Sequence, residues 1–147
     1  MPREIQVSVN IPAPPDVVWN DIADIASHVE WMADAESITF LSDQTSGTGT
    51  RMEVATKVGP FRLKDIMEFK RWEPPSVMAI RHQGLVTGEG EFHLDSTSAG
   101  GTRFTWREDL TFPWYLGGPV TEFFAAPVLK AIWARNLKRL QARFAQA

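Results

Sequence analysis

Hydrophobic and polar residues alternate in several segments of the chain, with the period of two that is typical of β-strands with one buried face. Short turns rich in Gly, Pro or Ser separate most of these alternating segments, which indicates neighbouring strands joined as hairpins. An antiparallel sheet is therefore expected. The alternation predicts seven strands, at residues 4–11, 37–41, 50–58, 61–72, 76–83, 89–94 and 100–112.

Two short helices are predicted between the first and second strands. Prolines at the start of "PAPPDVVW" suit a helix entry, where the missing N–H costs nothing. Apolar residues then recur with helical spacing at positions 17, 18, 22 and 25. The segment 27–32 predicts the second helix, with Ser27 as its N-cap and Glu30 in the capping-box position.

A long helix is predicted from Pro119 to the C-terminus, with a kink or a restart at Pro127. Leu129, Trp133 and Leu140 lie at the centre of its apolar stripe. A sheet with one apolar face needs a cover, and only this helix is long enough to supply it. Residues 1–147 are therefore expected to form a single α+β domain, a curved antiparallel sheet that grips the long helix.

The alternation also identifies the side chains that face the interior of this fold. Many of them are large aromatic rings or methionines, and the flexible methionine side chain suits an adaptable pocket as well as an ordinary core. We therefore interpret them as candidates for the wall of a ligand cavity, with core packing as the alternative. These apolar candidates are Met52, Met67, Phe69, Met78, Phe92, Trp106 and Trp133.

Four polar residues share these inward faces: Asp65, His82, Glu108 and Asn136. Glu108 is the clearest break in the pattern, because it falls on the apolar face of its strand next to Trp106. An unpaired buried polar group costs about 1–3 kcal/mol, and an isolated buried charge costs far more. Each of the four therefore needs a partner, water or a ligand.

The β-hairpin that turns at Pro74 and Pro75 would place His82 about opposite Met67, with Asp65 one inward step away. An Asp65–His82 contact is then sterically allowed, either as a structural pair or as part of a cavity wall. Glu108 belongs to a more distant strand and is expected near the cavity rim, and Asn136 is expected to face the sheet. The alternatives are a solvent-exposed carboxylate at a strand end and an amide bonded to a backbone carbonyl.

Three other features of the sequence are expected to lie outside the cavity wall or to shape its access. His28 and His93 are expected on the surface. Gly88 and Gly90 interrupt a strand and predict a bulge or a close approach of two backbones. The aromatic and glycine-rich segment 113–120 precedes the long helix and is expected to act as a gate at the cavity mouth.

Composition excludes several classes of function. A net charge of -3 and a pI near 5.6 argue against nucleic acids or anionic membranes as partners. The chain has no cysteine, no secretory h-region and no membrane-spanning run, which favours a cytoplasmic protein. Motifs for phosphates, dinucleotides or paired metal-binding histidines are absent, so no cofactor or metal is expected.

The order of elements, together with "IPAPPDVVW", "EWM", "KRWEPPSVMAIRHQG" and "GGTRFTW", resembles the START-like helix-grip superfamily, also called SRPBCC. The resemblance covers the whole chain and is greatest to the polyketide cyclase/dehydrase and lipid-transport branch. It implies a seven-stranded sheet around the long helix, with a ligand cavity between them. Members bind lipids, sterols, quinones, plant metabolites or polyketide intermediates, and only some of them are enzymes.

We therefore expect a protein that binds a small hydrophobic or amphipathic molecule, with the oligomeric state left open. The alternative is an aromatase/cyclase-type enzyme that acts on polyketides. His82 would then be the base, with Asp65 orienting it, and Glu108 or Asn136 would hold a carbonyl. The sequence departs from the resembled cyclases in its shortage of inward-facing Arg, Tyr and Ser for carbonyl contacts.

Overall fold

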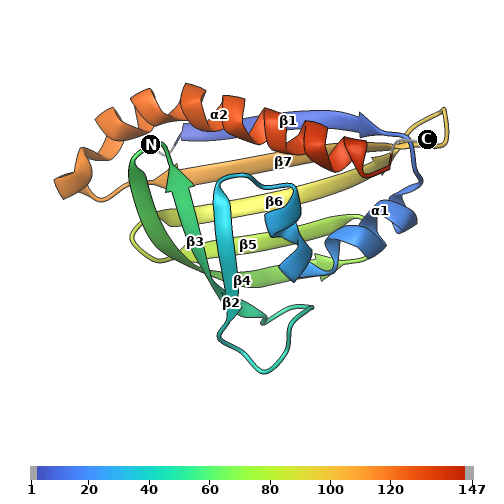
Figure 1. Ribbon diagram of the computed structural model, residues 1–147, viewed down its shortest axis with the longest axis horizontal. Helices are drawn as coiled ribbons and strands as arrows, with labels where there is room; N and C mark the ends of the chain where they lie inside the picture. Colours follow the sequence, from blue (N-terminus) through green and yellow to red (C-terminus); the bar gives the residue numbers. More distant parts are fainter. Residues whose placement is uncertain (1–2, 145–147) are drawn as a thin grey trace.

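The structure, a computed structural model, describes residues 3–144 and contains one seven-stranded antiparallel sheet in the order β1-β7-β6-β5-β4-β3-β2 (Figure 1). Every strand predicted from the alternation is present, and consecutive strands from β2 to β7 pair as hairpins. The strands are β1 (Arg3–Ile11), β2 (Ala35–Phe40), β3 (Arg51–Val58), β4 (Phe61–Glu73), β5 (Val77–Gln83), β6 (Thr87–Ser96) and β7 (Thr102–Thr111).

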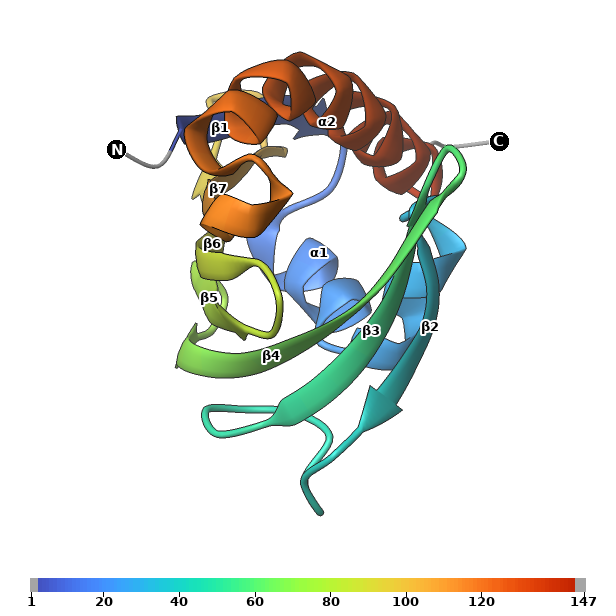
Figure 2. The ribbon, with the colours of Figure 1, turned by 90° about the vertical axis from the view of Figure 1, so that its left-hand side faces the viewer.

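Four helical segments accompany the sheet: α1 (Pro15–Ile22), η1 (Ile25–Glu30), η2 (Trp114–Leu116) and α2 (Gly118–Ala142). Figure 2 shows the sheet curving from β1 and β7 through β4 to β3 and β2, with α2 across the open side. The α+β helix-grip architecture predicted from the sequence is confirmed. Proline at position 127 does not restart the long helix, because α2 runs through it without interruption.

The packed part of the core lies toward the C-terminal end of α2. Trp31, Phe92, Phe104 and Trp106 form a cluster of tilted and edge-to-face rings, a favourable arrangement for aromatic pairs. Trp133 of α2 stacks on Trp106 with ring centroids 4.9 Å apart. Large apolar side chains of α2 are buried from Trp133 onward, and none is buried in the first half of the helix. The N-terminal half of α2 therefore covers an interior that is not filled by its own side chains.

Two expectations for the segment around η1 are wrong. Ser27 lies inside η1 rather than capping it, and its hydroxyl donates to the Asp24 carbonyl at 2.7 Å. His28 is buried rather than on the surface. The reason is that η1 is a 3₁₀-helix, in which residues three apart eclipse one another. Ile25, His28 and Trp31 consequently share one buried face.

Candidate functional site

A cavity of about 770 Å³ lies between the concave face of the sheet and α2. Its wall is mostly aliphatic, aromatic and methionine side chains from the middle strands of the sheet and from α2. Such an apolar concave surface with a few polar groups is the common form of a small-molecule site. All of the apolar candidates from the sequence line it: Met52, Met67, Phe69, Met78, Phe92, Trp106 and Trp133.

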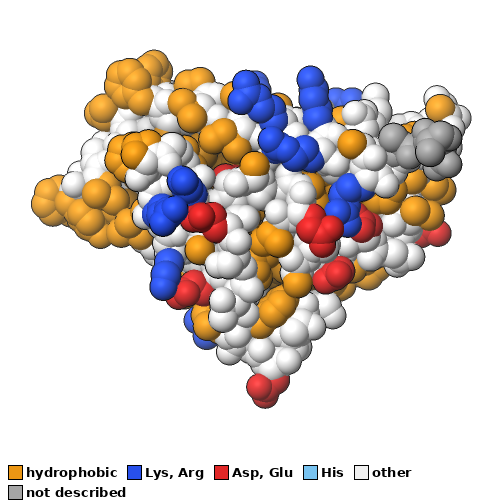
Figure 3. Space-filling view, in the orientation of Figure 1, with side chains coloured by type: hydrophobic (Ala, Val, Ile, Leu, Met, Phe, Trp, Pro, Cys, Tyr) orange, Lys and Arg blue, Asp and Glu red, His pale blue; other side chains and the backbone are white. Residues whose placement is uncertain are grey.

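The cavity has a hydrophobic rim at the N-terminal end of α2. Seven residues belong both to the lining and to the exposed large hydrophobic side chains, namely Phe61, Leu63, Leu85, Leu116, Val120, Phe124 and Val128. Hydrophobic side chains gather at this end of the molecule, on the left of Figure 3. The segment 113–120, predicted to be a gate, contributes Leu116 and Val120 to this rim. Apolar contact surface is thus continuous from solvent into the interior.

Asp65, His82 and Glu108 come together in one wall of the cavity. His82 Nδ1 lies 2.6 Å from Asp65 Oδ2, and His82 Nε2 lies 3.3 Å from Glu108 Oε2. The side chain of His82 is only 4% exposed and that of Glu108 is 8% exposed. The Asp65–His82 contact follows the predicted hairpin, in which Met67 is directly opposite His82.

Glu108 faces the concave side of the sheet, as expected, and its contact with His82 was not predicted from its place on a more distant strand. Glu108 is buried and reaches His82 across β6. Gly88 is opposite His82, and Gly90 is opposite Glu108. A Cβ atom on Gly90 would lie 2.7 Å from Glu108 Oε1. The two glycines therefore leave the inner face of β6 bare, and the carboxylate occupies the space that a side chain would fill.

Burial of His82 opposes its protonation, but the charge of Glu108 and the hydrogen bond with Asp65 outweigh that effect and raise the pKa of His82 to about 10. At neutral pH the ring is therefore an imidazolium between two carboxylates. Nδ1–H donates to Asp65, whereas Nε2 lies beside Glu108 as an ion pair without a hydrogen bond. Opposite charges on both sides are what make a buried charge tolerable.

Asn136 faces the interior and is fully buried, yet it does not line the cavity. Its Nδ2 donates to Asp34 Oδ1 at 2.7 Å, and its Oδ1 accepts from the Ala33 amide at 3.0 Å and from Arg139 at 2.9 Å. Trp133 Nε1 donates to the other oxygen of Asp34 at 3.2 Å. The amide expected to contact a ligand instead fixes the segment between η1 and β2 to α2.

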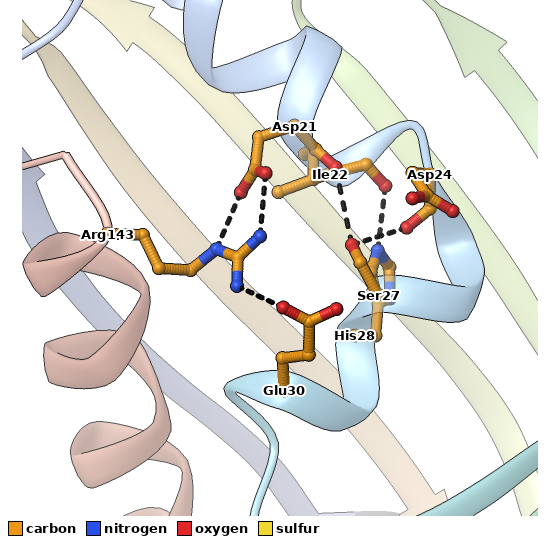
Figure 4. Close-up of polar contacts among 7 residues, drawn as sticks. All are labelled: Asp21, Ile22, Asp24, Ser27, His28, Glu30 and Arg143. Atoms are coloured by element: carbon orange, nitrogen blue, oxygen red, sulfur yellow. Dashed lines mark hydrogen bonds and ion pairs between the residues drawn. The ribbon is translucent and has the colours of Figure 1, made fainter.

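His28 is a lining residue that the sequence analysis missed. Its Nε2–H donates to the Ile22 carbonyl at 2.7 Å, a contact visible in Figure 4. Burial lowers the pKa of His28, so the ring is neutral near pH 7 and has no second N–H to offer. The sequence feature that could have indicated its burial is its spacing of three residues from both Ile25 and Trp31.

Arg143, directly after α2, joins the end of that helix to α1 and η1 (Figure 4). Its guanidinium forms two bonds with Asp21, at 2.8 and 2.9 Å, and a third with Glu30 at 2.9 Å. This bidentate arrangement fixes geometry more firmly than a single surface ion pair. It closes the packed end of the interior, opposite the hydrophobic rim.

We expect Arg143→Met to lower the free energy of unfolding by about 1–2 kcal/mol, because it removes a partly buried bidentate pair while keeping the aliphatic stem. Urea denaturation gives the value directly. The matched control is Arg81→Met, which breaks one exposed 3.3 Å contact with Glu89 and should change stability by less than about 0.5 kcal/mol. Equal effects of the two substitutions would contradict this assignment.

The family model for polyketide cyclase/dehydrase and lipid transport matches residues 2–145. The chain belongs to this family. No curated protein matches the sequence significantly. Within residues 3–144, no helix is long and apolar enough to cross a membrane, and no three His, Asp or Glu side chains are grouped to hold a metal ion.

Solved structures with the same fold cover nearly the whole chain. A protein from Thermus thermophilus is 20% identical, with a TM-score of 0.79 over 97% of both chains. The Zhui aromatase/cyclase of Streptomyces sp. R1128 is 20% identical, with a TM-score of 0.75 over 97% of this chain and 93% of that one. A START superfamily protein from Mycobacterium smegmatis is 12% identical, with a TM-score of 0.75 over 96% of each chain. At these identities the likeness establishes the fold alone.

Proposed function

We propose that this protein binds a small hydrophobic or amphipathic molecule in the cavity between the sheet and α2, and carries or sequesters it in the cytoplasm. The observation that supports the proposal is the cavity itself, about 770 Å³ with a nearly continuous apolar wall. Empty apolar volume destabilises a fold, because the lining atoms lose contacts that a packed core would give them. A ligand restores those contacts.

An enzyme of the aromatase/cyclase type is the second candidate, favoured by the buried Asp65–His82–Glu108 group in the wall. His82 does not suit the role of base that the sequence suggested, because it already holds its proton at neutral pH. A carboxylate would have to take that role. Native mass spectrometry of gently purified protein separates the candidates: a carrier returns its occupant unchanged, whereas an enzyme converts it and loses turnover in Glu108→Gln.

We expect 1-N-phenylnaphthylamine, a neutral dye that fluoresces in apolar surroundings, to bind the wild-type protein saturably. Met67→Trp should raise the dissociation constant at least about tenfold, because the larger ring occupies cavity space, and a tenfold change corresponds to about 1.4 kcal/mol. Ile66→Trp is the control, since the neighbouring side chain lies outside the lining. Absence of saturable binding, or equal affinity in both variants, would refute the proposed site.

A further inference from the structure

The buried group in the cavity wall carries more acceptors than donors. His82 Nδ1 donates to Asp65, and His82 Nε2 forms an ion pair with Glu108 at 3.3 Å without a hydrogen bond. The charge of the ring is thus shared between the two carboxylates. The polar atoms that this wall offers to the cavity are consequently mainly carboxylate oxygens, which only accept hydrogen bonds.

At least one of these oxygens lacks a protein donor. Asp65 Oδ1 is buried and has no hydrogen-bond partner among the described residues. Glu108 lines the cavity and lies over the bare backbone at Gly90, where its Oε1 would be the first atom met by an added Cβ. Buried acceptors without donors are costly, so a ligand that supplies a donor is favoured over one that does not.

The imidazole, hydroxyl and ammonium groups elsewhere in the lining are either bonded to backbone or lie at the rim. His28 and Thr121 each donate to a backbone carbonyl. Thr56 is paired with Leu63 in the sheet and so lies beside the exposed rim. Lys64 has a flexible cationic group, but its side chain is 75% exposed. The wall around His82 thus carries two carboxylates against one imidazolium.

We infer that the ligand carries a hydrogen-bond donor, a hydroxyl or an amine, at the end that reaches Glu108, and that ligands ending in a carboxylate or phosphate are rejected. This inference rests on the proposed binding function and adds the chemical class of the ligand's polar end. A donor would bond to a charged acceptor in an apolar surrounding, where such bonds are strong. An anion in the same place would face two like charges against a single imidazolium that both of them already attract.

Four ligands with the same alkyl chain test the head group by displacement of 1-N-phenylnaphthylamine at neutral pH: decan-1-ol, decylamine, decyl methyl ether and decanoate. The alcohol and the amine should bind at least about tenfold more tightly than the ether and decanoate, as expected for hydrogen bonds to a charged acceptor. Decanoate that binds as tightly as decanol, or the ether as tightly as decanol, would overturn the inference.

Glu108→Gln tests whether Glu108 is the acceptor that selects the ligand's polar end, because an amide can donate as well as accept. The preference for decanol over decanoate should fall at least about tenfold in this variant, and remain unchanged in Glu89→Gln, which alters an exposed carboxylate of β6. An unchanged preference in Glu108→Gln would overturn the assignment to Glu108. Failure of the dye itself to bind wild-type protein would instead refute the proposed function, so the two failures are distinguishable.

Discussion

The free energy of unfolding of the wild-type protein should fall by about 3–5 kcal/mol as the pH is raised from 7 to 10, the range for breaking a buried ion pair. The cause is the loss of the proton from His82, whose folded-state pKa is about 10. Its ordinary value, which applies to the unfolded chain, is 6.5. The measurement is a series of urea denaturation curves across this pH range.

The direction of this pH dependence follows from the linkage between proton binding and folding. Because the pKa of His82 is higher in the folded state, its contribution to stability is complete below pH 6.5 and disappears as the pH rises through about 10. Between these values the folded protein binds one more proton than the unfolded chain, so stability falls by about 1.4 kcal/mol per pH unit. His28 acts in the opposite sense and at lower pH, because burial lowers its pKa and its effect is complete above pH 6.5.

The groups that face His82 are Asp65 from β4 and Glu108 from β7, while β6 presents glycine at positions 88 and 90. His82→Gln is the direct comparison. It should be about 3–5 kcal/mol less stable than wild type at pH 7, since two buried carboxylates lose their cation. Its stability should also stay nearly constant from pH 7 to 10. A wild-type profile as flat as that of the variant would show that His82 is not held protonated.

The strands and their inward faces could be predicted from the sequence because alternation depends only on local chain geometry. The contact between Asp65 and His82 could be predicted for a similar reason, since the two residues lie on one hairpin whose register the turn fixes. The approach of Glu108 could not, because it depends on three paired strands and on the missing side chains of β6. The glycine at position 90 was the sequence feature that could have indicated space for a carboxylate. Its interpretation as a bulge or a close approach of two backbones did not reveal that space.

The existence of the cavity was harder to predict than its wall. Met78 and Trp106 would look the same in the sequence whether they packed against other side chains or against empty space, because both environments select large apolar residues. The interior position of Asn136 could be predicted from the helical period, but its contacts with Ala33 and Asp34 could not. These two residues lie about a hundred positions away, in a segment whose path depends on the short period of η1.

Gly88→Ala should lower the free energy of unfolding by about 3 kcal/mol or more, through strain and overpacking in the sheet. Gly88 has a φ of 131°, which side chains rarely tolerate, and a Cβ atom there would lie 1.8 Å from the Asp109 carbonyl oxygen. That oxygen belongs to the backbone of β7, so β6 and β7 would have to separate. Urea denaturation at pH 7 measures the loss.

Gly100→Ala separates backbone strain from steric overlap, the two causes of the loss expected in Gly88→Ala. Gly100 also has a positive φ, 83°, but nothing lies within 4 Å of its added Cβ. Only the backbone cost remains, and the loss should be about 1 kcal/mol. The excess in Gly88→Ala then measures the close approach of β6 to the backbone of β7 at this position. Equal losses in the two variants would mean that the two strands separate easily at Gly88 and that the steric overlap adds nothing to the backbone cost.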